Sequence, residues 1–168
     1  MSETVEGRVT AAAEDEIVVF LIGMRINSFA ALRSWVPVAR AMPKMIKELA
    51  REKEHGLLGF QALLGFPRVA YVVQYWESKE KLLAYASAPD KEHRPAWGEF
   101  NRRLRLRQGR GKVGIWHETY VVPAGSYESV YVNMPAFGLG AATGVVPVGR
   151  RGERAAERLG LKRESSAP

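Results

Sequence analysis

The stretch from Glu16 to Asn27 constrains the fold of this chain most strongly, because its apolar residues leave neither face of a β-strand polar. Successive side chains of a strand point to opposite faces of the sheet, so a strand that is apolar throughout is buried on both sides. The sheet that contains it therefore needs a layer on each face. Helices of the same chain can supply one layer, and a second copy of the chain can supply the other. The sequence thus predicts a homodimer.

The patterns that follow this strand have the order of a ferredoxin-like domain. A helix is expected from Phe29 to about Glu54. Because proline lacks the N–H that a helix interior uses, Pro37 and Pro43 predict either two pieces or a kink. The remaining elements are expected as strands at 57–66, 69–76 and 113–122, and as helices at 79–87, capped by Ser78, and 91–106. The order β-α-β-β-α-β predicts an α+β, ferredoxin-like fold with one antiparallel sheet.

The two ends of the chain differ in composition from the part between them. We expect a disordered N-terminus at 1–14, a ferredoxin-like domain at 15–135, and a Gly-rich loop with a basic C-terminal tail at 136–168. Within the last two parts, residues 127–133 can add a strand and residues 154–161 can form a short helix.

Composition and charge exclude several classes of protein. The chain has no cysteine, which removes disulfides, thiolate metal ligands and thiol nucleophiles. Its best apolar run, residues 17–26, is far shorter than the roughly 20 residues that span a bilayer, and the polar, acidic start is unlike a signal peptide. We therefore expect a cytoplasmic protein without a membrane partner. The net charge of +7 comes from basic runs that are typical of solvated surface, and no nucleic-acid-binding motif accompanies them, so nucleic acid is not the expected partner.

The segment from Gly114 to Tyr120 carries the polar groups best suited to chemistry. On a strand, alternation places His117 on one face with Ile115 and Thr119, and places Glu118 on the other face with Trp116 and Tyr120. A neutral imidazole can act as a general base or bind haem iron, so His117 and His93 are the leading catalytic candidates. Glu118 is the third, although it points away from His117. The alternative for each histidine is a hydrogen-bonded structural role.

Large aromatic residues can line a cavity for a flat aromatic substrate. The candidate substrate-binding residues are Trp76, Trp97, Trp116, Tyr120, Tyr131 and the basic Arg94. The alternative is that these aromatics belong to the ordinary core. Acidic residues do not gather with histidines at metal-ligand spacing, so no metal site is predicted.

Several motifs resemble a known family. They are Gln74-Tyr75-Trp76-Glu77-Ser78, His93-Arg94-Pro95-Ala96-Trp97, Gly114-Ile115-Trp116-His117-Glu118-Thr119-Tyr120 and Tyr131-Val132-Asn133-Met134-Pro135. Between about Val18 and Leu139 the chain is similar to a largely uncharacterised bacterial family, which is grouped with a monooxygenase-like protein of fungal fumagillin biosynthesis. The resemblance implies a dimeric α+β barrel and a monooxygenase-like activity. It implies no particular catalytic residue.

Three functions are compatible with these observations. The first is a cofactor-free oxygenase that acts on a small hydrophobic or aromatic molecule of the secondary-metabolite type, with a histidine as base. The second is a haem-binding, dehydratase- or peroxidase-like enzyme on the same barrel, in which Arg94 could pair with the propionates. The third is a non-catalytic dimer that binds a small ligand. The resemblance favours the first, with no cofactor.

Overall fold

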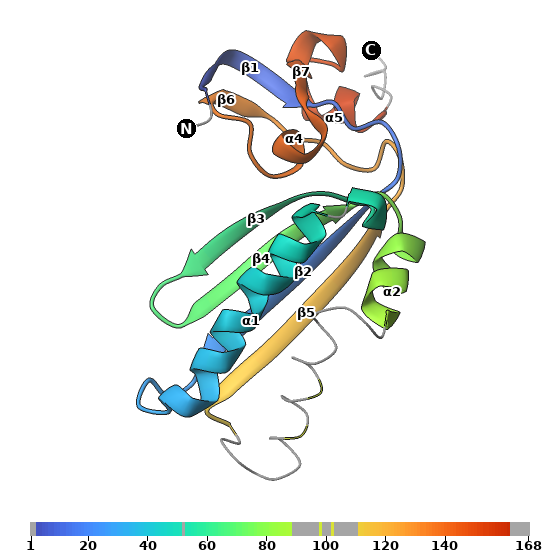
Figure 1. The fold of residues 1–168 in the computed structure, drawn as a ribbon. Helices are drawn as coiled ribbons and strands as arrows, with labels where there is room; N and C mark the ends of the chain where they lie inside the picture. The colour runs from blue at the N-terminus through green and yellow to red at the C-terminus, as the bar shows by residue number, and fades with distance from the viewer. Residues whose placement is uncertain (1–2, 52, 89–97, 99–101, 103–110, 162–168) are drawn as a thin grey trace, which may run out of the picture.

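The computed structural model describes residues 3–51, 53–88, 98, 102 and 111–161. In this part the chain forms a four-stranded and a three-stranded sheet, both antiparallel (Figure 1). The larger sheet has the order β3-β4-β2-β5, and the smaller has the order β6-β1-β7. The strands of the larger sheet are β2 (Ile17–Ile26), β3 (Leu57–Gly65), β4 (Val69–Trp76) and β5 (Val113–Val122).

The order of the larger sheet confirms the predicted α+β, ferredoxin-like fold. β2 lies between β4 and β5, and β3 pairs with the outer edge of β4. In chain order the first strand is therefore central, between the third and the fourth, which is the arrangement that the βαββαβ pattern gives. The connection from β4 to β5 begins with α2 (Lys79–Ser87), where Ser78 accepts a hydrogen bond from the Lys81 backbone, 3.2 Å. The helix predicted at 91–106 falls largely outside the described residues.

Helix α1 (Leu32–Arg51) covers one face of the larger sheet (Figure 1). Val38, Met42, Met45 and Leu49 follow one another at intervals of four, three and four residues, and they form one stripe that faces the sheet. Of the two expected arrangements, two pieces or one kinked helix, the chain forms a single helix that includes both internal prolines. Among the described residues no helix combines the length and the apolar character that crossing a bilayer requires.

The core between the helices and the sheet lies at one end of α1. Val18, Leu49, Trp76, Leu82 and Tyr85 are buried there, and the side chains of Val18 and Trp76 are 0% exposed. Full burial of one such side chain stabilises the fold by about 1.5–3 kcal/mol. This cluster fixes the end of α1 and α2 against β2 and β4.

The N-terminus differs from its prediction. Val5–Ala11 forms β1, the central strand of the smaller sheet, so the expected disorder is wrong for these residues. β1 pairs with β6 (Tyr131–Met134) and with β7 (Val145–Pro147). Its partners come from the distant end of the chain. The local sequence pattern around β1 therefore does not indicate which strands pair with it.

The C-terminal part is also more ordered than a Gly-rich loop and tail. It contains β7, the helices α4 (Gly138–Thr143) and α5 (Ala155–Arg158), and the 3₁₀ turn η2 (Val148–Arg150). Two of its arginines hold it in place. The Arg151 guanidinium donates to the Ala13 and Ala12 carbonyls at 2.6 and 2.8 Å, and Arg158, whose side chain is 5% exposed, pairs with Glu128 at 2.8 Å. Part of the basic charge therefore serves the fold.

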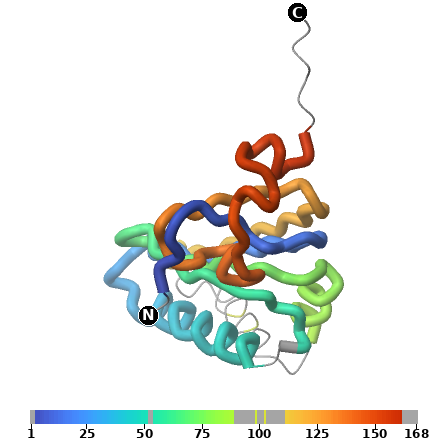
Figure 2. Tube along the Cα trace, turned by 90° about the horizontal axis from the view of Figure 1, so that it is seen from above, coloured from blue at the N-terminus to red at the C-terminus, as the bar shows by residue number. Residues whose placement is uncertain are grey.

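The smaller sheet and α4 cover part of the second face of the larger sheet (Figure 2). Ala11, Ala13 and Leu139 form a buried cluster with Ile17 of β2, and α4 packs so closely that Ala142 touches the Gly59 backbone. The chain thus supplies part of the layer for which a second copy was expected. The homodimer remains a prediction, and it now concerns the uncovered part of this face.

Candidate active-site cavity

A cavity of about 680 Å³ lies between α1, α2 and the larger sheet. Its walls are mostly aliphatic. They include Val38, Met42 and Met45 from α1, Ile22 and Met24 from β2, and Ile115 from β5. Concave, mainly apolar cavities of this size with a few polar groups are the usual form of a small-molecule site. The cavity is therefore the candidate functional site.

His117 lines this cavity together with Ile115 and Thr119, which confirms that the three residues share one face of β5. In the sheet His117 lies opposite Ile22, and its ring centroid is 5.8 Å from that of Phe20. The His117 side chain is exposed rather than locked in the core. Among the described residues neither imidazole nitrogen has a hydrogen-bond partner within the protein, so both can serve a bound molecule.

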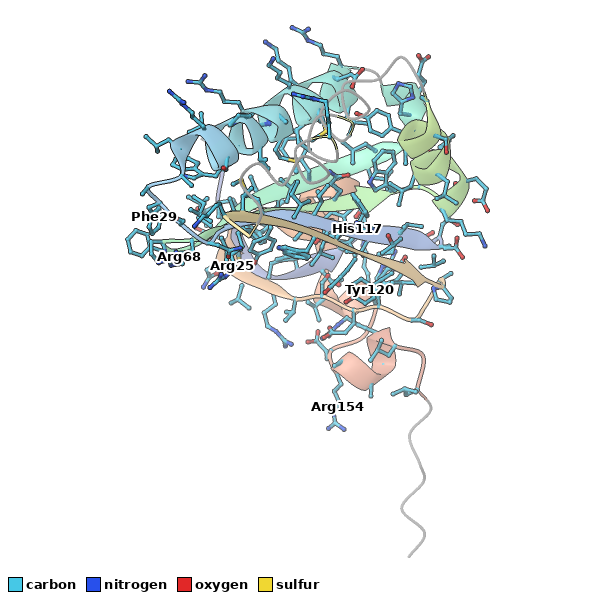
Figure 3. The ribbon with its side chains drawn as sticks, turned by 90° about the horizontal axis from the view of Figure 1, so that it is seen from below. Arg25, Phe29, Arg68, His117, Tyr120 and Arg154 are labelled. Carbon is cyan, nitrogen blue, oxygen red and sulfur yellow. The ribbon has the colours of Figure 1, made fainter. Side chains whose placement is uncertain are left out.

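Glu118 lies on the opposite face of β5, as alternation predicts. Its carboxylate accepts a 2.7 Å hydrogen bond from the Tyr120 hydroxyl, and Figure 3 shows Tyr120 on the side of the sheet away from α1. That hydrogen bond, followed by the carboxylate charge, raises the pKa of Tyr120. In this arrangement Glu118 is not placed to orient His117 or to reach the cavity.

Four of the predicted substrate-binding aromatics are not among the described residues that line the cavity, which corrects the expectation that they surround it. Trp116 and Tyr120 project from the other face of β5, where Trp116 packs on Tyr71 with ring centroids 5.9 Å apart. Tyr131 belongs to the smaller sheet, and its hydroxyl accepts from the Gly140 backbone at 2.9 Å. Trp76 is on the cavity side but lies within the buried core.

The other three predicted site residues, His93, Arg94 and Trp97, lie outside the described residues. A meeting of His93 with His117, and a role of Arg94, therefore stay predictions. Within the described part of the chain, no group of three or more His, Cys, Asp or Glu side chains is placed to bind a metal ion.

Gln74, a buried amide among the described lining residues, was not one of the predicted site residues. Gln74 is 4% exposed, and its amide oxygen accepts a 2.9 Å hydrogen bond from the Trp76 indole N–H. A signal for it exists in the sequence. Val72, Gln74 and Trp76 alternate along β4, so a polar residue occupies an inward position between two large apolar ones.

This chain is similar to Monooxygenase af470 of Aspergillus fumigatus. The two are 27% identical over an alignment of 189 positions, which covers 100% of this chain and 65% of the relative. The chain thus spans less than two thirds of the length of that protein.

Two solved structures show a weaker likeness. SnoaB, a cofactor-independent oxygenase from Streptomyces nogalater, is 12% identical with a TM-score of 0.39, over 63% of this chain and 91% of that one. A dimeric ferredoxin-like protein of unknown function from Jannaschia is 20% identical with a TM-score of 0.40, over 61% and 97% of the two chains.

The predicted relationship to monooxygenase-like proteins is confirmed by a family model that covers most of the chain. The model of the family described as Monooxygenase af470-like matches residues 17–139, from the first residue of β2 to the start of α4. The chain belongs to the monooxygenase af470-like family.

Proposed function

We propose that the protein is a monooxygenase-like enzyme that oxidises a small, flat, hydrophobic molecule in the cavity under α1, without a cofactor and with His117 as the base. The observation that carries this proposal is an apolar cavity of about 680 Å³ that has one imidazole among its described lining residues. Family membership supports the reaction class. A relation to fumagillin-type metabolism stays a prediction, as does the cytoplasmic location.

The chemistry requires a substrate with an acidic C–H bond. His117 accepts that proton, and the apolar walls keep water from competing for the resulting carbanion. The carbanion gives one electron to O2, and the two radicals combine to form a C–O bond. The peroxide takes the proton back from the imidazolium and then eliminates water. In total one CH2 group and one O2 become one C=O group and one H2O, so the atoms and electrons balance and O2 is the oxidant.

Anthrone is a suitable probe because its CH2 group is acidic and its product, anthraquinone, has a distinct absorption spectrum. Purified protein and anthrone are mixed in an oxygen electrode. We expect uptake of one O2 for each anthraquinone formed, at a rate proportional to protein concentration. Oxygen uptake no faster than in buffer, despite bound anthrone, would instead favour the non-catalytic binding protein.

The haem alternative has its own test. His117 offers an imidazole that could ligate iron, but the described lining residues include no arginine or lysine for the propionates, and Arg94 lies outside the described residues. The ultraviolet–visible spectrum is recorded before and after addition of hemin. We expect no Soret band in the purified protein and no shift of the hemin band. A sharp, saturable shift that is lost in His117→Ala would favour the haem enzyme.

A further inference from the structure

We propose that Gln74 is the oxygen-binding residue of the cavity and that the substrate is an aromatic ketone. Its amide N–H groups donate hydrogen bonds to the substrate carbonyl, and they stabilise the negative charge that this oxygen acquires when His117 removes the proton. This inference rests on the proposed function and goes beyond it, because it names the class of substrate and a second group that acts on it.

The orientation of the Gln74 amide follows from its partner. The Trp76 indole nitrogen lies 2.9 Å from the amide oxygen, and an indole N–H can only donate. The oxygen must therefore face the indole, which leaves the NH2 group facing elsewhere. Trp76 is 0% exposed, so the indole that fixes this orientation is itself held by the core.

The NH2 group of Gln74 is a buried donor in need of an acceptor. Gln74 is 4% exposed and lines the cavity, and among the described residues no protein group accepts a hydrogen bond from its amide nitrogen. Buried polar groups in proteins are nearly always hydrogen-bonded. A carbonyl oxygen on a molecule in the cavity would meet this need.

The register of the sheet places Gln74 and His117 on either side of Phe20. Gln74 of β4 is opposite Phe20 of β2, Phe20 is opposite Thr119 of β5, and His117 lies two residues along the same strand. From strand spacing and rise, the backbones of Gln74 and His117 are roughly 12 Å apart. Both side chains stand on the same face as Phe20, roughly perpendicular to the sheet, so a flat molecule that lies on the Phe20 ring between them can offer one end to each.

This arrangement suits a ketone whose acidic CH2 and carbonyl groups lie across one ring, as in anthrone. When the proton leaves the CH2 group, the electron pair moves through the ring to the carbonyl oxygen. N–H donors bind an oxyanion more strongly than a neutral carbonyl, so Gln74 favours the ionised substrate. No net oxidation occurs in this step, and O2 reacts afterwards.

Ionisation of bound anthrone can be measured without turnover. Under argon, the protein and anthrone are titrated from pH 6 to 11, and the absorbance of the anthrone anion gives the apparent pKa of the bound ligand. Gln74→Met removes the donors and keeps the length of the side chain. We expect the variant to raise this apparent pKa by about one to two units, as the loss of a hydrogen bond to a charged group predicts. In air, kcat should fall about 10- to 100-fold with KM changed less than about three-fold.

Two controls separate the role of Gln74 from folding and from binding. The double variant Gln74→Met/Trp76→Phe removes the indole N–H as well, so no buried donor loses its acceptor, and it should show the same shift. Anthracene has the same ring framework without a carbonyl, and it should bind to Gln74→Met as it does to the wild type.

The outcomes distinguish two failures. If the wild type binds and oxidises anthrone but neither variant changes the ligand pKa or kcat, the role of Gln74 is wrong and the proposed function stands. If the wild type binds neither anthrone nor anthracene, the proposed function fails and this inference fails with it. Weaker binding of anthracene by both variants would show that Gln74 only shapes the cavity, which also overturns the inference.

Discussion

The contact between α4 and β3 gives a sharp test of how the two sheets fit together. A Cβ atom built on Gly59 would lie 2.8 Å from the Ala142 Cβ and 2.9 Å from the Ala142 Cα. Real Cβ atoms do not approach other carbons so closely. The Ala142 Cα is part of the α4 backbone, so it cannot move away by rotation of a side chain. Gly59→Ala should therefore push α4 away from the sheet.

The size of the effect follows from two opposing terms. Overpacking of a well-filled contact costs typically about 1–3 kcal/mol. Replacing a strand glycine by alanine also stabilises the fold by up to about 1 kcal/mol, because the unfolded chain loses freedom. Gly114→Ala in β5 is a matched control for the second term, since its Cβ would meet only the Asn27 amide nitrogen at 4.0 Å. The difference between the two variants is the overpacking cost.

Thermal unfolding followed by circular dichroism measures this difference. For a chain of 168 residues, about 2 kcal/mol corresponds to about 4–8 °C in Tm. We expect the Tm of Gly59→Ala to lie below that of Gly114→Ala by this amount. Equal Tm values would refute the close packing of α4 on β3, and with it the idea that the chain covers part of the second face itself.

Three further predictions concern the ion pair of the C-terminal part, a tyrosine and the oligomeric state. Glu128→Gln should lower the free energy of unfolding by about 2 kcal/mol, less than the 3–5 kcal/mol of a fully buried pair, because Glu128 is 30% exposed while Arg158 is 5% exposed. Urea unfolding checks this, with Glu153→Gln as an exposed control at under about 1 kcal/mol; equal losses would contradict it. The hydrogen bond to Glu118 raises the pKa of Tyr120 in the folded protein. This hydrogen bond therefore stabilises the fold below about pH 10, and the stabilisation is lost as the Tyr120 hydroxyl ionises at higher pH. Ultraviolet titration of Glu118→Gln should therefore show one tyrosine ionising at lower pH, and an unchanged curve would be evidence against the hydrogen bond. Light scattering at micromolar concentration should give twice the mass of one chain, and a strict monomer would rule out the homodimer.

Local pattern was sufficient for the elements that carry the cavity. The strand at 69–76 and the helix at 79–87 have the predicted bounds, because β-branched and aromatic residues mark the first and the cap at Ser78 marks the start of the second. Alternation along β5 also assigned His117 and Glu118 to opposite faces correctly. These features are determined by residues that are close in the sequence, so the local pattern is enough to predict them.

Features that depend on distant partners were not predictable in this way. β1 is a polar strand whose partners begin more than 120 residues later, so its sequence alone resembles a loose terminus. Trp116 and Tyr131 have side chains suited to a binding site. However, Trp116 lies on the face of the larger sheet away from the cavity, and Tyr131 lies in the smaller sheet. Gln74 was not predicted because a single amide in an apolar strand indicates a site only once its side chain is known to line a cavity.

The role of His117 as the base is tested most directly by the anthrone oxidation rate of His117→Gln, compared with that of His55→Gln. Both variants replace an imidazole by an amide, but His55 is not among the described residues that line the cavity. We expect His117→Gln to lose at least about 100-fold in kcat, as removal of a general base does, and His55→Gln to stay within about two-fold of the wild type. Full activity in His117→Gln would contradict the assignment of His117 as the base.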